Sequence, residues 1–168
     1  MRSILQISKE PKNLTEWEPC VPLGHGGRLF TCGRPGRATF GTCRARVDDD
    51  TVQLWLKGLP AAEMLHIVSL LGRKKDGFSE FAYYSFRSAR ECGGKPTFQQ
   101  WLNARYGQRF VVHEFPTMDA QGIPKGMLQR VTDGIRKLIK GGKTVVVVDS
   151  GGAARTVKVA KAIGYTKK

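Results

Sequence analysis

The chain has 168 residues, 40% of them hydrophobic, and its 28 lysines and arginines against 14 aspartates and glutamates give a formal net charge of +14. This length suits a single domain with one hydrophobic core. No apolar run reaches the length of a membrane span, and the N-terminus lacks the apolar stretch and cleavage site of a secretory signal peptide. We therefore expect a cytoplasmic domain without a membrane span.

Strand and helix patterns alternate along the chain without internal repeats, which is typical of an α/β fold. In the N-terminal half we expect a short strand at 4–7, a hairpin or irregular segment at 24–46, and a strand at 66–71. Residues 78–86 are rich in aromatic side chains and fit either a helix or a packed loop. An amphipathic helix after Asp48 is predicted by apolar residues spaced three and four apart, which are Val52, Trp55, Leu56 and Leu59.

The C-terminal half predicts two helices and two strands before its last loop. A helix over 97–106 begins with a capping box of Thr97 and Gln100 and stops at Gly107. A strand is expected at 110–115, and a second helix should run from Pro124 to the glycine pair at 141–142. Four consecutive valines at 145–148 then predict a strand buried on both faces, and therefore central in the sheet.

A loop of small residues follows this central strand. Backbone N–H groups of such a loop can surround an anion at the start of a helix, where the helix dipole also favours negative charge. The sequence is neither a Walker A motif nor a dinucleotide-binding fingerprint. The loop and the start of the helix after it consist of Asp149, Ser150, Gly151, Gly152, Ala153, Ala154, Arg155 and Thr156.

The spacing Asp-x-x-Gly-x-x-Arg-Thr resembles the signature loop of the cysteine-dependent protein tyrosine and dual-specificity phosphatases, His-Cys-x-x-Gly-x-x-Arg-[Ser/Thr]. Val148 stands in place of the histidine and Asp149 in place of the nucleophilic cysteine. Residues 27–36 and 64–71 resemble two strands of the family's sheet, and 113–119 resembles the strand and loop that carry its general acid.

The resemblance implies one compact domain over 1–168, with a central, mostly parallel sheet flanked by helices. Residues 1–23 would be an N-terminal extension, and 143–165 the signature strand, loop and helix. The family's usual helices beyond the signature helix are missing, so the domain is expected to be C-terminally truncated relative to the family.

The resemblance also implies roles for individual residues. Arg155 would bind two phosphate oxygens with its planar guanidinium. Asp119 stands one residue before the family's general-acid position, and an ordinary turn aspartate is the alternative. The carboxylate of Asp149 would be held by the same loop amides that bind phosphate in the family, and would occupy the phosphate's place. It is also a weaker nucleophile than a thiolate.

Charge and cysteine content limit the kinds of partner and ligand that we expect. A cluster of arginines predicts a surface patch that binds a polyanion, with an attraction that salt would weaken. The cluster consists of Arg28, Arg34, Arg37, Arg44 and Arg46. The four cysteines form no CxxC pair and have no nearby histidine at zinc-ligand spacing, so we expect free thiols and neither a metal nor a cofactor. These cysteines are Cys20, Cys32, Cys43 and Cys92.

These patterns together predict a pseudophosphatase, a catalytically impaired domain that binds a phosphorylated or other polyanionic partner. Two alternatives stay open. The first is an active phosphoric monoester hydrolase that uses Asp149 unconventionally or a thiol from elsewhere in the chain. The second is a nucleic-acid-binding protein that relies on the net charge and the arginine cluster.

Overall fold

The structure is a computed structural model that describes residues 10–37, 49–72, 97–117 and 122–168. The strand expected at 4–7 and the aromatic segment at 78–86 lie outside these ranges. Within them, no helix combines the length and apolar character that crossing a lipid bilayer requires.

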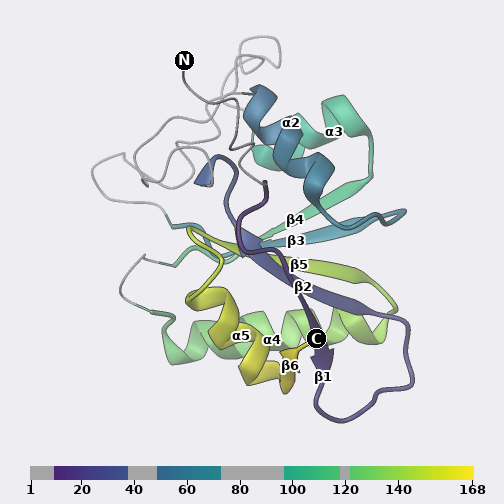
Figure 1. The fold of residues 1–168 in the computed structure, drawn as a ribbon, viewed down its shortest axis with the longest axis vertical. Coiled ribbons are helices and arrows are strands. Elements are labelled where there is room, and N and C mark those ends of the chain that lie inside the picture. Colours follow the sequence, from purple (N-terminus) through teal and green to yellow (C-terminus); the bar gives the residue numbers. More distant parts are fainter. Residues whose placement is uncertain (1–9, 38–48, 73–96, 118–121) are drawn as a thin grey trace, which may run out of the picture.

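A six-stranded sheet in the order β4-β3-β5-β2-β1-β6 forms the middle of the molecule (Figure 1). The first four strands of this order pair in parallel, whereas β1 pairs antiparallel with both β2 and β6. The expected mostly parallel α/β sheet is confirmed, with the four-valine strand β5 between β3 and β2. The strands are β1 Thr15–Pro19, β2 Arg28–Gly33, β3 Leu65–Ser69, β4 Phe110–Glu114, β5 Thr144–Asp149 and β6 Tyr165–Lys167.

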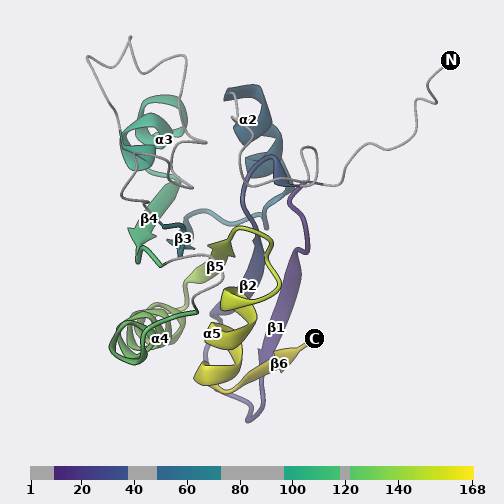
Figure 2. The same ribbon diagram turned by 90° about the vertical axis from the view of Figure 1, so that its left-hand side faces the viewer.

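Two described helices cover each face of the sheet (Figures 1 and 2). Helices α2 (Asp49–Gly58) and α3 (Phe98–Tyr106) lie on one face, and α4 (Lys125–Lys140) and α5 (Arg155–Ile163) lie on the other. Successive residues of a strand point to opposite faces. Alternate valines of β5 therefore contribute to two separate cores, one beneath each pair of helices.

Local capping patterns set the helix ends that the sequence predicts. The Thr97 side chain accepts a hydrogen bond from the backbone of Gln100 at 3.2 Å, and the Gln100 side chain accepts one from the backbone of Thr97 at 2.9 Å. This capping box begins α3, and Gly107 ends it with a φ of 63°. Helix α4 likewise ends at Gly141, and Gly142 follows with a φ of 76°.

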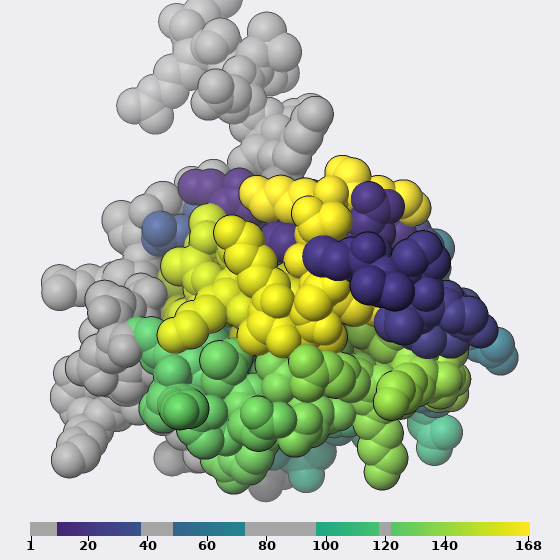
Figure 3. Space-filling view, turned by 90° about the horizontal axis from the view of Figure 1, so that it is seen from below, coloured from purple at the N-terminus to yellow at the C-terminus, as the bar shows by residue number. Residues whose placement is uncertain are grey.

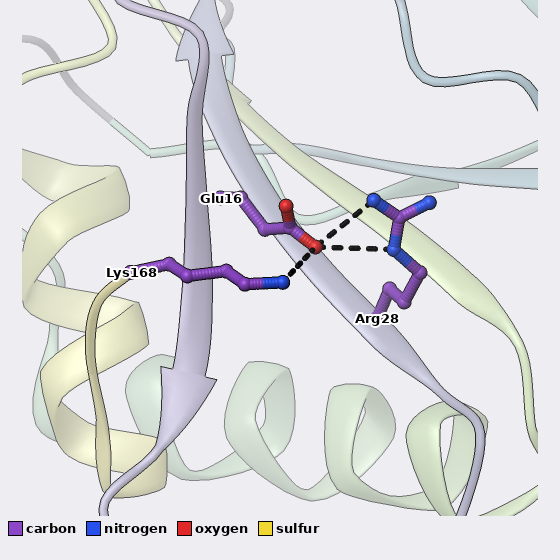
Figure 4. A network of polar contacts seen from close by, with 3 residues as sticks. All are labelled: Glu16, Arg28 and Lys168. Carbon is purple, nitrogen blue, oxygen red and sulfur yellow. Dashed lines mark hydrogen bonds and ion pairs between the residues drawn. The ribbon is translucent and has the colours of Figure 1, made fainter.

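Strands β1 and β6 are absent from the expectations drawn from sequence. β1 lies inside the segment assigned to an N-terminal extension, yet it is part of the sheet, and its Trp17 is only 3% exposed. The Trp17 indole donates a hydrogen bond to the Thr31 hydroxyl at 2.8 Å. At the surface Glu16 accepts from Arg28 at 2.9 Å and lies 3.5 Å from the Lys168 ammonium (Figure 4). Exposed ion pairs of this kind contribute about 0–1 kcal/mol each. The buried indole of Trp17 therefore contributes more than these pairs to holding β1 in the sheet.

Candidate functional site

Strand β5 delivers Asp149 to the carboxyl edge of the parallel strands, where the chain turns through the signature loop, Ser150–Ala154, into α5 (Figure 2). Ligands of open α/β sheets commonly bind at this edge. Gly152 has a φ of 71°, and a Cβ there would lie 2.9 Å from the Cα of Cys32, with the backbone nitrogen of Gly33 nearer still. The loop is therefore packed against the end of β2, with no room for a side chain at this turn.

The carboxylate of Asp149 is bonded to backbone N–H groups of the loop and of the helix after it. One oxygen accepts a hydrogen bond from the Gly152 amide, and the other accepts from the Thr156 amide at 2.9 Å. The Thr156 amide is one of the first-turn donors that lack a partner inside the helix. Ala154 at the N-cap offers no side-chain acceptor, and Asp149, at 2% exposure, supplies it instead. A negative group thus occupies the helix N-terminus from within the chain.

Arg155 lies at the start of α5 with its side chain buried. Its Nη1 donates to the Leu70 carbonyl at 3.1 Å and to the Thr117 hydroxyl at 3.0 Å. The same hydroxyl donates to the Leu70 carbonyl at 2.7 Å. Arg155 thereby joins the segments that follow β3 and β4 to the signature helix. Asp119, two residues after Thr117, lies outside the described residues.

Two hydroxyl groups, one in the loop and one in the first turn of α5, are buried without a hydrogen-bond partner in the described part of the chain. They are the Oγ of Ser150 and the Oγ1 of Thr156. Buried polar groups are nearly always satisfied in folded proteins, and exceptions often mark sites of function. These hydroxyls and the carboxylate of Asp149 place three buried polar groups at the carboxyl end of β5.

A neighbouring segment supports the loop from the N-terminal side. The side-chain amide of Asn13 donates to the Gly151 carbonyl at 2.7 Å, and the Lys12 carbonyl accepts from the Gly33 amide at 2.8 Å. Asn13 has a φ of 56°, a left-handed conformation that asparagine tolerates better than most residues. Sequence reasoning missed this contact, because nothing local indicates that residues 138 positions apart meet.

The predicted arginine patch is not one surface in the described residues. Arg28 begins β2 and pairs with Glu16, whereas Arg34 follows the other end of this strand, about 20 Å from Arg28 at the usual rise per residue. Arg34 is also 0% exposed, so a surface patch that includes it is wrong. Arg37 lies next to the loop near Gly151. Arg44 and Arg46 lie outside the described residues.

A different basic surface covers the outside of α4 and α5, which lie side by side in Figure 3. The two helices contain a single acidic residue, Asp133. We call their exposed cations the basic face, and they are Lys125, Arg130, Lys137, Lys140, Lys158 and Lys161. The pattern was available in the sequence, because the lysines and arginines of α4 alternate with its apolar residues at helical spacing.

The two described cysteines do not place a reactive thiol at the loop. Burial above all raises the pKa of Cys32 well above its ordinary value, and the nearby charges of Asp149 and Glu10 raise it further. Its thiol therefore stays protonated at neutral pH. Cys20 follows β1 and donates its backbone N–H to Gly164, at the opposite end of the sheet from the loop. Cys43 and Cys92 lie outside the described residues, among which no three potential metal ligands cluster.

Comparison with solved structures finds a similar fold in the crystal structure of a kinase associated phosphatase whose catalytic site cysteine is substituted by serine. The superposition has a TM-score of 0.58 and 18% sequence identity, and covers 92% of this chain and 74% of that one. The chain has a dual-specificity-phosphatase-like fold. Comparisons with family models and with curated proteins find no match. The phosphatase resemblance drawn from the signature loop is thus confirmed for the fold.

Proposed function

We propose that this domain is a catalytically impaired phosphatase-like module that binds a phosphorylated or other polyanionic partner. One observation carries the proposal. The carboxylate of Asp149 accepts hydrogen bonds from the amide of Gly152, in the loop that the phosphatase resemblance assigns to phosphate, and from the amide of Thr156 in the first turn of α5. An incoming phosphate would have to compete with a negative charge that is already bonded there.

The chemistry around Asp149 argues against the active-phosphatase alternative. A carboxylate is a weaker nucleophile than a thiolate, and its charge repels the phosphoryl group that it would attack. The only described thiol close to the loop is that of Cys32, which burial keeps protonated. The roles of Arg155 as anion ligand and of Asp119 as general acid remain part of the proposal.

The chain is expected to hydrolyse an aryl phosphate such as para-nitrophenyl phosphate no faster than buffer. The release of para-nitrophenolate by the purified protein measures this directly. Asp149→Cys should restore weak activity at best, because Val148 in place of the family's histidine leaves the site incompletely supported. Turnover by the parent chain that disappears in Asp149→Ala would contradict the proposal, since it would make Asp149 a working nucleophile.

The binding part of the proposal relies on charge. The net charge of +14 would draw an anionic partner over long range, and the basic face concentrates cations on one side of the sheet. Lys158 stands on this face one turn after Arg155, close to the signature loop. A partner with several phosphates could therefore contact the basic face and the edge of the loop together.

Affinity for a multiply phosphorylated peptide should fall steeply with salt, because each lysine bound to a phosphate releases counterions. Replacing Lys158 and Lys161 by glutamine should lower the slope of log affinity against log salt by about 1 for each lysine. The matched control replaces Lys57 and Arg109, on the other side of the sheet, by glutamine. This control should leave the slope nearly unchanged. Equal slopes in the two double variants would show that the basic face is not the binding surface.

The nucleic-acid alternative is tested by the same titration. A duplex oligonucleotide and the phosphorylated peptide are compared at one salt concentration with the parent chain. Preference for the peptide supports a phosphoprotein partner. Tighter binding of the oligonucleotide, weakened by the glutamine substitutions at Lys158 and Lys161, would favour nucleic acid instead.

A further inference from the structure

A cavity of about 410 Å³ lies between β3, β4 and α4, away from the signature loop. Its apolar wall consists of Val68, Phe115, Ile135 and Leu138. This volume lies within the range of about 300–1,000 Å³ that is usual for small-molecule sites. No residue of the signature loop lines it, so phosphate binding at Asp149 does not account for it.

A glycine inside α4 keeps this cavity open. Gly134 is in the middle of the helix and lines the cavity, and a Cβ at this position would meet only the Cζ of Phe115, at an ordinary contact distance of 4.0 Å. Gly134 is not among the glycines with a positive φ, so neither backbone conformation nor crowding demands glycine here. Glycine is a poor helix former. The missing side chain thus leaves space at some cost to the helix.

Two histidines lie together at this side of the sheet. The rings of His66 and His113 are stacked with centroids 5.3 Å apart, and the Nδ1 of His66 is 3.0 Å from the Nε2 of His113. One nitrogen must donate and the other accept at this distance. Burial lowers the pKa of both rings, and for His66 the charges of His113 and Lys143 lower it further. The pair is therefore uncharged at neutral pH.

Among the described residues that line the cavity, the charged groups are the ammonium groups of Lys137 and Lys143, and none is an aspartate or a glutamate. An apolar space with lysines and no acid complements a molecule that has an apolar body and a negative group. A cation would be repelled, and a neutral hydrocarbon would leave the ammonium groups without a counter-charge.

We propose that this cavity binds a small amphiphilic anion, with its apolar body against Phe115 and the space left by Gly134, and its carboxylate or sulfonate at Lys137 or Lys143. The site goes beyond the proposed function, because it takes a small apolar acid and uses none of the residues of the signature loop. Lys137 also belongs to the basic face, so a free apolar acid bound here would share this lysine with the polyanionic partner.

The probe for this site is 8-anilinonaphthalene-1-sulfonate, titrated into the full chain and followed by fluorescence, with decanoate as competitor. We expect saturable binding that decanoate displaces. Gly134→Leu places a branched side chain in the cavity opposite Phe115 and should weaken binding at least tenfold, whereas the matched Gly134→Ala should change it less than threefold. Equal binding by these two variants, or no saturable binding by the parent chain, would overturn the proposal.

The charge requirement is tested separately. The double substitution Lys137→Gln and Lys143→Gln should lower the affinity for the sulfonate probe about tenfold. It should leave the affinity for the neutral analogue, N-phenyl-1-naphthylamine, nearly unchanged. Weaker binding of both probes, or unchanged binding of both, would contradict the assigned role of the lysines. If Gly134→Leu does not fold, the proposal is tested by nuclear magnetic resonance, from the ring proton resonances of His113 in the parent chain. They should shift as the sulfonate probe binds, and resonances that stay in place would overturn the proposal.

Discussion

Gly152→Ala is expected to destabilise the domain by about 3 kcal/mol, which is a large effect for one methyl group. A left-handed backbone costs a residue with a Cβ about 1–2 kcal/mol, and overpacking costs about 1–3 kcal/mol more. Both apply here, because the φ of Gly152 is 71° and the new Cβ would lie 2.9 Å from the Cα of Cys32. The colliding atoms belong to backbone and cannot move aside as a flexible side chain would.

The neighbouring glycine provides the matched control. A Cβ on Gly151 would meet only the Nε of Arg37, at 4.0 Å, so Gly151→Ala should change the free energy of unfolding by less than about 1 kcal/mol. Urea denaturation of both variants measures the difference. Equal destabilisation by the two substitutions would mean that the loop does not pack on the end of β2 as described.

Several elements were predictable because their causes are local. The capping box at Thr97, the glycine stop at Gly107 and the four-valine strand are each determined by a few adjacent residues, and each is found in the fold. The small residues from 150 to 154 likewise predict a loop between this strand and the last helix, and the loop lies there between β5 and α5. Apart from the central place of the four-valine strand, no local pattern indicates the order of the strands in the sheet.

Other features were missed because their causes are distant in sequence. Strand β6 has three residues, too few to show a period, and exists because it pairs with β1 at the other end of the chain. The burial of Arg34 cannot be read from an arginine-rich stretch, which by itself suggests an exposed patch. Asn13 reaches the signature loop through tertiary packing alone.

The charge on Asp149 is expected to be what keeps anions out of the signature loop. At about 4 Å and an effective dielectric constant near 20, two like charges repel by about 4 kcal/mol, which is roughly a thousandfold in affinity before screening by salt. Asp149→Ser removes this charge and releases the amides of Gly152 and Thr156 for a ligand. Sulfate or phosphate should therefore bind this variant up to about a thousand times more tightly than the parent chain.

The substitution also removes two hydrogen bonds, so the free variant should be less stable by about 1–3 kcal/mol. Bound sulfate should restore stability in proportion to its occupancy, which thermal unfolding detects. Asp133→Ser is the matched control, since it changes the net charge equally at an exposed site on α4. Its affinity for sulfate should stay within about twofold of that of the parent chain if the effect is local, because exposed charges are screened.

The most direct test of whether Asp149 keeps anions out of the signature loop is calorimetric titration with sulfate at constant ionic strength. The proteins compared are the parent chain, Asp149→Ser and Asp133→Ser. The account predicts weak or undetectable binding by the parent chain and by Asp133→Ser, and strong single-site binding by Asp149→Ser. Equally weak binding by all three proteins would show that the signature loop is not an anion site. Equally tight binding would show that Asp149 does not prevent anions from binding there.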